Sequence, residues 1–182
     1  MNKTVIITGA AKGIGRAIAK DFAYSGYNVC INYNTSEEQA KELCQELAKD
    51  GCNIIIYKAD VTNRQEVDKM VDYVIGTFGN IDVLINNAGI SEYKLFTDIT
   101  QEDMEKMVNV NILGVFNTTQ SVLRKSMLPR KDGTIINISS IWGMVGASLE
   151  VAYSTTKAAI IGMSKALAKE LAPSNITVNV VA

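Results

Sequence analysis

Short, continuous apolar segments alternate along this 182-residue chain with longer segments of helical periodicity. Apolar runs of strand length are typical of strands buried on both faces of a parallel sheet. Six such strands are predicted, at Thr4–Thr8, Asn28–Tyr33, Asn53–Ala59, Ile81–Ile85, Thr134–Ile138 and Ile176–Val181. Helices are predicted at Ile14–Ser25, Ser36–Asp50, Asn63–Phe78, Gln101–Lys125 and Tyr153–Ala172, and loops at Ser91–Thr100 and Ile141–Glu150. This order predicts an α/β fold, a doubly wound parallel sheet with helices on both faces, with residues 1–182 as a single domain.

A glycine-rich turn, Thr8–Gly15, joins the first strand to the first helix. Gly9 permits a tight turn, Gly13 lets backbone N–H groups approach a pyrophosphate, and Gly15 allows close packing of helix on strand. This arrangement predicts a dinucleotide site of the Rossmann type. An ordinary flexible turn between strand and helix is the alternative.

The residues after the second strand bear on the choice of cofactor. An NAD-specific site usually has an acidic residue about 20 positions past the glycines, on the ribose 2′-hydroxyl. Residues 32–35 are Asn, Tyr, Asn and Thr, without a carboxylate, whereas Lys12 in the glycine turn could face a 2′-phosphate. We therefore expect NADP rather than NAD, although Lys12 alone is equally consistent with a solvated loop lysine.

Polar amides occur at two further places where they require an explanation. Asn86–Gly89 follows a buried strand, and the carboxyl ends of such strands are where open α/β sheets bind ligands. The alternative is that these amides satisfy local backbone groups at a turn. Asn111 lies within an apolar helical stretch, where a buried amide either fixes backbone or holds a water molecule.

Tyr153 and Lys157 are spaced i,i+4 in an apolar run, so on a helix they share one face. An ammonium about 4 Å from a phenol contributes roughly 4 kcal/mol at an effective dielectric near 20. That is about enough to bring a phenol close to pH 7, where acid–base catalysis works best. Ser140 lies thirteen positions upstream of the tyrosine. The alternative is a surface tyrosine and lysine one helical turn apart.

The composition excludes several classes of function. The chain has no histidine, which removes Ser-His-Asp hydrolysis and histidine acid–base chemistry. Its three cysteines are odd in number and lack C-x-x-C spacing, which predicts reduced thiols in a cytoplasmic protein and no metal site. The net charge of −1 gives no reason to expect nucleic acid or a membrane as partner.

Taken together, these motifs resemble those of the short-chain dehydrogenase/reductase family over essentially the whole chain. The motifs are TGAAKGIG at Thr8–Gly15, Asp60-Val61, NNAG at Asn86–Gly89, Asn111, Ser140 and YSTTK at Tyr153–Lys157. The resemblance is greatest to the β-ketoacyl-acyl-carrier-protein reductases of fatty acid biosynthesis, through Lys12, Tyr153–Ala172 and Ile176–Ala182.

The resemblance implies a role for each matching residue. Tyr153 is the proton donor in carbonyl reduction, and Lys157 makes its hydroxyl a stronger acid and binds the nicotinamide ribose. Ser140 holds the substrate carbonyl, and Asn111 anchors a water in the proton relay. The implied cofactor contacts are Gly9, Lys12, Gly13, Ile14 and Gly15 at the phosphates, Asn34 near the adenosine ribose, Asp60 and Val61 near the adenine, and Asn87 beside the cofactor.

The sequence departs from the family's pattern in two ways. Many NADP-dependent relatives carry an arginine where this chain has Asn34, so the 2′-phosphate would depend mainly on Lys12. Relatives also continue beyond this point with a Pro-Gly turn, a substrate-covering segment and a seventh strand. A sixth strand left as a bare edge is rarely tolerated, so we expect the sequence to be a fragment of a longer protein.

The predicted function is NADPH-dependent reduction of a small-molecule or acyl-carrier-bound carbonyl. A short-chain alcohol, sugar or hydroxysteroid dehydrogenase is the alternative within the family. A non-catalytic dinucleotide sensor is the alternative from a different class, and it has no need of Ser140, Tyr153 and Lys157 together.

Assembly is predicted from the apolar residues on two helices. The Tyr153 helix is apolar nearly all round, and so is the neighbouring stretch Val108–Phe116. Such helices must be covered on more than one side, and the sheet covers only one. A C-terminal segment is one possible cover. The resemblance favours another subunit, which predicts a homodimer or a homotetramer.

Overall fold

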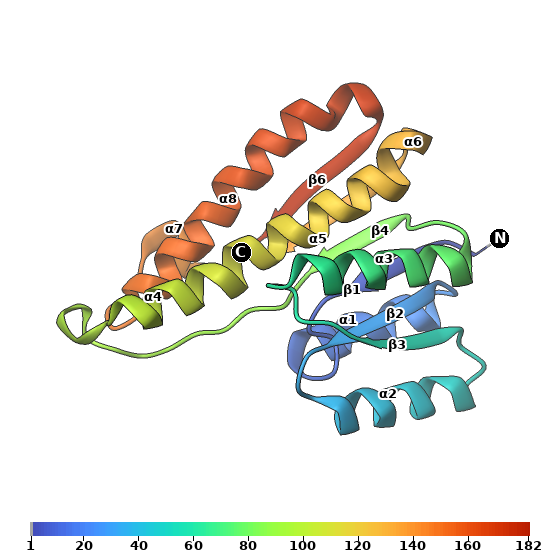
Figure 1. The fold of residues 1–182 in the computed structure, drawn as a ribbon, viewed down its shortest axis with the longest axis horizontal. Helices are drawn as coiled ribbons and strands as arrows, with labels where there is room; N and C mark the ends of the chain where they lie inside the picture. Colours follow the sequence, from blue (N-terminus) through green and yellow to red (C-terminus); the bar gives the residue numbers. More distant parts are fainter. Residues whose placement is uncertain (1) are drawn as a thin grey trace.

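The computed structural model describes residues 2–182, and they form one six-stranded sheet in which every strand pairing is parallel (Figure 1). The strand order is β3-β2-β1-β4-β5-β6. The strands are β1 (Thr4–Ile7), β2 (Asn28–Tyr33), β3 (Ile54–Lys58), β4 (Val83–Asn86), β5 (Gly133–Ile138) and β6 (Ile176–Val181). The predicted doubly wound parallel sheet is confirmed.

Helices connect successive strands. The α-helices are α1 (Gly13–Tyr24), α2 (Glu37–Lys49), α3 (Arg64–Phe78), α4 (Gln101–Val108), α5 (Gly114–Val122), α6 (Leu128–Arg130), α7 (Trp142–Val145) and α8 (Val151–Leu171). Two π-helical segments, η2 (Asn109–Leu113) and η3 (Leu123–Met127), and two 3₁₀ turns, η1 (Phe96–Asp98) and η4 (Ala172–Ser174), complete the list.

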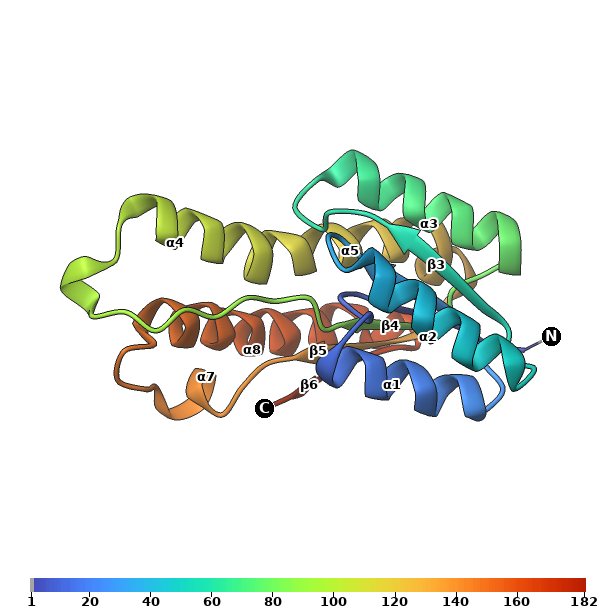
Figure 2. The same cartoon turned by 90° about the horizontal axis from the view of Figure 1, so that it is seen from below.

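Helices cover both faces of the sheet (Figures 1 and 2), and an apolar cluster lies on each face. On one face, alternate residues of the strands pack against α1 and α2, for example Ile7 and Ile31 against Leu43. On the other face, the intervening strand residues pack against α3, η3 and the end of α8, for example Leu84 against Met70. The central strands are therefore buried on both sides, which explains their continuous apolar runs.

Three sequence expectations were wrong in detail. The segment Ile141–Glu150 is not only loop, because it contains the four-residue helix α7, too short for periodicity to reveal. The segment Ser91–Thr100 likewise contains η1. The predicted helix Gln101–Lys125 continues to Arg130 and is interrupted by η2 and η3. Its apolar residues surround the helix so broadly that a local change of helical phase leaves no visible pattern.

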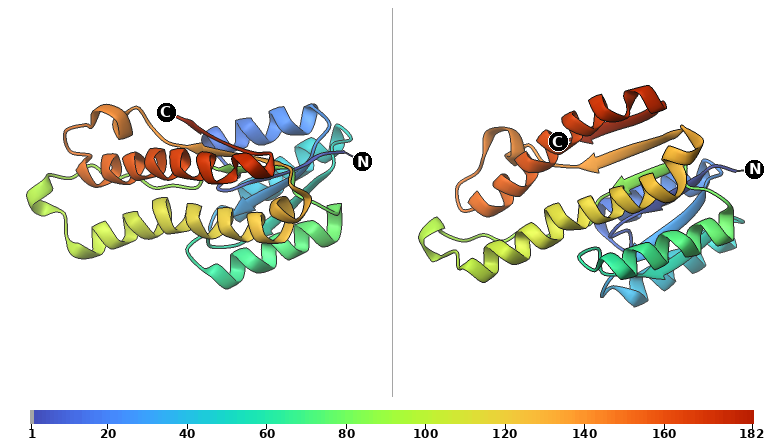
Figure 3. Two further views of the ribbon diagram at one scale, coloured as in Figure 1. Left: turned by 90° about the horizontal axis from the view of Figure 1, so that it is seen from above. Right: turned by 45° about the horizontal axis from the view of Figure 1, so that its top comes forward.

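The order of the strands reverses between β1 and β4, and a crevice opens there at their carboxyl ends. The long helices α4–α5 and α8 run side by side and extend beyond the sheet (Figure 3). Within residues 2–182, β6 pairs only with β5 and is an edge of the sheet. No helix in this part of the chain combines the length and apolar character needed to cross a membrane.

Candidate active site

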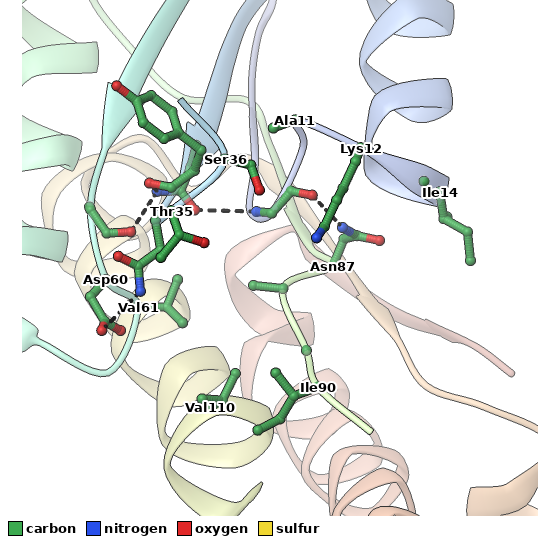
Figure 4. Close-up of a pocket in the computed structure, with 18 residues that line it drawn as sticks. Ala11, Lys12, Ile14, Thr35, Ser36, Asp60, Val61, Asn87, Ile90 and Val110 are labelled. Atoms are coloured by element: carbon green, nitrogen blue, oxygen red, sulfur yellow. Dashed lines mark hydrogen bonds between the residues drawn. The ribbon is translucent and has the colours of Figure 1, made fainter. Parts of the chain in front are cut away.

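A cavity of about 580 Å³ lies at the carboxyl ends of β1, β2, β3 and β4 (Figure 4). Its volume is within the range of small-molecule and cofactor sites. Eight predicted cofactor residues line it: Gly9, Lys12, Gly13, Ile14, Asn34, Asp60, Val61 and Asn87. Residues not singled out from the sequence line it too: Ala11, Asn32, Tyr33, Thr35, Ser36, Ala59, Ala88, Gly89, Ile90 and Val110.

The glycine turn has the backbone geometry expected of a phosphate cradle. Gly9 and Gly13 have positive φ angles of 63° and 57°, which side chains other than glycine rarely adopt. Gly15 does not line the cavity. Instead, a Cβ atom on Gly15 would lie 2.5 Å from Asn87 Nδ2 and 2.7 Å from the Gly9 carbonyl oxygen. It therefore allows α1 to begin directly beneath the turn, where its first N–H groups can bind an anion.

Asn87 and Thr8 hold the turn against the end of β4. Asn87 Nδ2 donates hydrogen bonds to the carbonyl oxygens of Thr8 at 2.9 Å and Gly9 at 3.2 Å. Thr8 Oγ1 accepts from the backbone N–H groups of Asn87 and Ala88, both at 3.0 Å. The Asn87 amide thus serves the backbone of a segment distant in sequence and not its own turn.

Asn32 lines the site, although the sequence did not predict a role for it there. It is 1% exposed, its Oδ1 accepts from the Gly9 N–H at 3.3 Å, and its Nδ2 donates to the Ala59 carbonyl at 3.0 Å. Its side chain therefore joins the glycine turn to the ends of β2 and β3. The available signal was a buried amide near the carboxyl end of an otherwise apolar strand.

The charges around the cavity come from few residues. Among the lining residues that the structure describes, Asp60 carries the only carboxylate, and it accepts hydrogen bonds from Asn34 Nδ2 at 3.1 Å and Thr62 N at 2.9 Å. Lys12 is exposed at the rim, and its side chain extends toward Asn87 (Figure 4). The cavity thus offers a cation and free backbone N–H groups to an anionic ligand.

The predicted catalytic hydroxyls meet at a second, mostly apolar cavity of about 670 Å³, which Ser140 and Tyr153 both line. Ile14 lines this cavity and the first, so the two adjoin. Ser140 Oγ accepts a hydrogen bond from the Trp142 N–H at 3.2 Å and, within residues 2–182, makes no other. Its own proton is therefore available to a ligand.

Lys157 lies beneath these hydroxyls and is 5% exposed. Its Nζ donates to the Ile138 carbonyl at 2.8 Å and lies 5.6 Å from the centre of the Tyr153 ring. Burial lowers the pKa of Lys157 from its ordinary value. The i,i+4 spacing thus places the Lys157 ammonium beside the Tyr153 ring. The ammonium lies within the protein and not in solvent.

Asn111 is fully buried in the π-helical segment η2. Its Oδ1 accepts from the Ile90 N–H at 2.8 Å, and its Nδ2 donates to the Ile90 carbonyl at 2.9 Å and to Thr156 Oγ1 at 3.1 Å. Of the two alternatives from the sequence, the structure shows backbone fixation, at a residue that lines the first cavity. Anchoring of a relay water stays a prediction.

Comparison with known families agrees with this geometry, because the short chain dehydrogenase family model matches residues 3–182. The chain belongs to this family. Membership confirms the prediction of an NAD(P)-dependent oxidoreductase.

The short chain dehydrogenases most similar in sequence include 3-oxoacyl-[acyl-carrier-protein] reductases. The chain is 41% identical over 182 residues to FabG of Staphylococcus epidermidis, and the match covers 100% of this chain and 74% of that protein. It is 40% identical over 183 residues to the uncharacterized oxidoreductase YmfI of Bacillus subtilis, with the same coverage.

Solved structures of similar proteins carry a nicotinamide cofactor. A variant of actinorhodin polyketide ketoreductase with NADPH matches with a TM-score of 0.96 and 34% identity, covering 100% of this chain and 69% of that one. ElxO with NADP bound matches with a TM-score of 0.92 and 39% identity, covering 100% and 73%.

Proposed function

We propose that this protein is an NADPH-dependent reductase of β-ketoacyl groups carried by acyl-carrier protein, acting in cytoplasmic fatty acid synthesis. The observation that carries the reaction type is the meeting of the Ser140 and Tyr153 hydroxyls at one cavity, with Lys157 buried beside them. Sequence identity of 41% to a 3-oxoacyl-[acyl-carrier-protein] reductase supports the substrate class.

The first cavity fits a dinucleotide phosphate because the glycine turn presents main-chain atoms to it at Gly9 and Gly13. Positive φ angles at Gly9 and Gly13 turn backbone toward the ligand, and Lys12 adds a cation at the rim. When bound, the nicotinamide supplies hydride. The protein supplies position and a proton.

At the second cavity, Ser140 binds the substrate carbonyl and Tyr153 transfers the proton. Ser140 Oγ, already accepting from Trp142 N, donates its proton to the carbonyl oxygen and orients it. Tyr153 Oη delivers the proton that completes the hydroxyl product. The buried Lys157 ammonium stabilises the phenolate left on Tyr153, because the surrounding protein screens its charge little.

The preference for NADPH over NADH is supported by two features. The end of β2 provides Asn34 and Thr35 at the cavity, without the carboxylate that would bind a ribose 2′-hydroxyl. Lys12 provides positive charge for a 2′-phosphate, and similar solved structures hold NADP or NADPH.

A substrate panel tests the function. Acetoacetyl-acyl-carrier protein, a ketosteroid and an open-chain ketose are each supplied with NADPH and with NADH, and nicotinamide oxidation is followed. We expect the highest kcat/KM for the acyl-carrier substrate with NADPH. Preference for the steroid or sugar would replace the proposal by the corresponding dehydrogenase. Tight NADPH binding without turnover of any carbonyl would indicate a sensor.

We also propose a homodimer, or a homotetramer built from dimers, formed through α5 and α8. Leu113 and Phe116 are 44% and 47% exposed on η2 and α5, and the neighbouring face of α8 exposes Ala158, Ala159 and Ala166. Small residues allow a partner helix to approach closely, and exposed aromatic residues of this kind occur at interfaces.

Introducing a charge at Phe116 tests this assembly. Phe116→Lys should give monomers in sedimentation experiments at micromolar concentration, whereas Tyr24→Lys on α1 should leave the assembly intact. Leu167, a natural choice from sequence, is unsuitable because it packs on the buried cluster beside α3. A parent protein that sediments as a stable monomer would contradict the proposal.

A further inference from the structure

The single-turn helix α7 packs directly on the backbone of the catalytic helix α8. A Cβ atom on Gly143 would lie 2.7 Å from the Lys157 carbonyl carbon and 2.9 Å from the Ala158 nitrogen. Real Cβ atoms do not approach other atoms so closely, and backbone atoms in a helix cannot move aside as a flexible side chain does. Gly143 has no positive φ, so its requirement is for space and not for conformation.

The same glycine is joined to the catalytic serine. The Gly143 N–H donates to the Ser140 carbonyl at 2.9 Å, and the adjacent Trp142 N–H donates to Ser140 Oγ at 3.2 Å. Ser140 and α7 therefore form one short unit. A displacement of α7 carries the serine hydroxyl with it.

Lys157 is also tied to the end of β5 and to the residue that follows it. Ser139 Oγ donates to the Lys157 carbonyl at 2.9 Å, and Lys157 Nζ donates to the Ile138 carbonyl at 2.8 Å. Ser139 is 6% exposed, so water competes little for this bond. Extra volume at residue 143 must therefore change the separation of α7 and α8, and the two hydrogen bonds of Lys157 resist movement of α8.

From these contacts we infer that Gly143 and Ser139 are positioning residues that set the separation between the Ser140 hydroxyl and the Tyr153–Lys157 pair. Gly143 sets how closely α7 can approach α8, and Ser139 holds the Lys157 carbonyl by a hydrogen bond. The inference rests on the proposed function, in which these three residues act on one carbonyl.

Kinetics of Gly143→Ala test the inference. A misplacement of about 1 Å at an active site can reduce turnover by about 100-fold. We expect kcat to fall by about 10- to 100-fold, with the dissociation constant for NADPH changed less than about twofold. Gly76→Ala on α3 is the matched control, because its Cβ would meet nothing within 4 Å.

Two further measurements distinguish positioning from general damage. Trp142 is the only tryptophan, so a change in its emission in Gly143→Ala, absent in Gly76→Ala, reports movement of α7. In a Ser140→Ala background, adding Gly143→Ala should reduce kcat less than about twofold further, because residues that act through one another are non-additive. Full additivity, or unchanged emission, would overturn the inference.

If Gly143→Ala does not fold, Ser139→Ala tests the inference in its place. It removes the hydrogen bond to Lys157 without adding volume, and we expect a fall of about threefold to tenfold in kcat that also vanishes in the Ser140→Ala background. Parental kcat in this variant would then overturn the inference. If Ser140→Ala and Tyr153→Phe lose most of their activity while Gly143→Ala is fully active, only the inference fails. Parental activity in Ser140→Ala would defeat the proposed function as well.

Discussion

The crevice at the ends of β1, β2 and β3 and the catalytic end around Ser140 and Tyr153 are built differently. In the crevice, the side chains of buried Thr8 and Asn32 and of half-buried Asn87 form hydrogen bonds with main-chain atoms, so the main chain defines its shape. At the catalytic end, the segments around η1 and α7 instead expose several apolar side chains: Leu95, Phe96, Met144, Val145 and Leu149.

This difference has a functional meaning. A cradle of backbone fixed by buried side chains suits a cofactor of constant shape. An exposed apolar surface beside the reacting hydroxyls is typical of a binding surface that something else covers. Cofactor binding and catalysis should therefore respond to separate sets of substitutions.

The largest expected effect is on kcat, from a substitution at the catalytic end that should leave the crevice unchanged. Tyr153→Phe removes the proposed proton donor, and proton transfer contributes about 10²- to 10⁴-fold. We expect kcat to fall by that factor while the dissociation constant for NADPH stays within about threefold. Stopped-flow turnover and fluorescence titration measure the two quantities, with Tyr73→Phe on α3 as control. Carbonyl reduction at the parental rate by Tyr153→Phe would rule out its role.

The converse effect is expected in the crevice. Gly15→Ala forces Asn87 and the glycine turn apart, and overpacking of this kind costs about 1–3 kcal/mol. If that cost falls on cofactor binding, the dissociation constant for NADPH rises by about 10- to 100-fold. Turnover at saturating NADPH should fall much less. Gly76→Ala is again the control, and unchanged NADPH affinity in Gly15→Ala would contradict the close packing of α1 on β4.

A smaller effect is expected on the preference for NADPH over NADH, from a substitution at the rim that leaves the shape of the crevice unchanged. Lys12→Glu replaces the cation at the rim by an anion, so NADPH should bind about tenfold more weakly. NADH affinity should change little, because it lacks the 2′-phosphate. Isothermal titration of both cofactors checks this, with Lys69→Glu as control. If the unmodified protein binds NADH more tightly than NADPH, the cofactor assignment is wrong.

The smallest effect concerns stability at the catalytic end. Burial lowers the pKa of Lys157, which means that the folded protein loses stability by holding its ammonium away from water. Lys157→Met should therefore raise the midpoint of thermal unfolding by about 2–4 °C at pH 7 while abolishing activity. Lys69→Met should leave the midpoint unchanged.

The pH dependence of this gain has a definite sign. The folded-state pKa of Lys157 lies below its ordinary value of 10.5, so the loss of stability is complete at neutral pH, where both states are protonated. It fades as the pH rises through the lowered pKa toward 10.5. Differential scanning calorimetry should show the advantage of Lys157→Met shrinking at alkaline pH. A variant less stable than the parent at pH 7 would show that the bond to Ile138 outweighs desolvation.

The sequence predicted the sheet well because its central strands are buried on both faces and must be continuously apolar. The strand Asn28–Tyr33 was predicted with its observed bounds for this reason. The site residues of the glycine turn were also predictable, since positive φ and close packing restrict the residue type locally.

The missed features share a different physical origin. The turn α7 is too short for periodicity, and the contacts of Gly143 and Ser139 join segments whose proximity only the folded chain reveals. Asn32 likewise acts on Gly9, which is distant in sequence. Spacing along the chain identifies residues that act within one element, whereas packing between elements has no such signature.

The π-helical segment η2 has a consequence for insertions and deletions. A π-helical turn holds about one residue more than an α-helical turn, so removing one residue from Asn109–Leu113 should convert this segment to regular α-helix. The flanking helices α4 and α5 would keep their relative rotation, and Met107 would stay buried. Residues within the segment would change direction, and Asn111 would lose its hydrogen bonds to Ile90. A single-codon deletion here should therefore disturb the site more than the packing of the two helices.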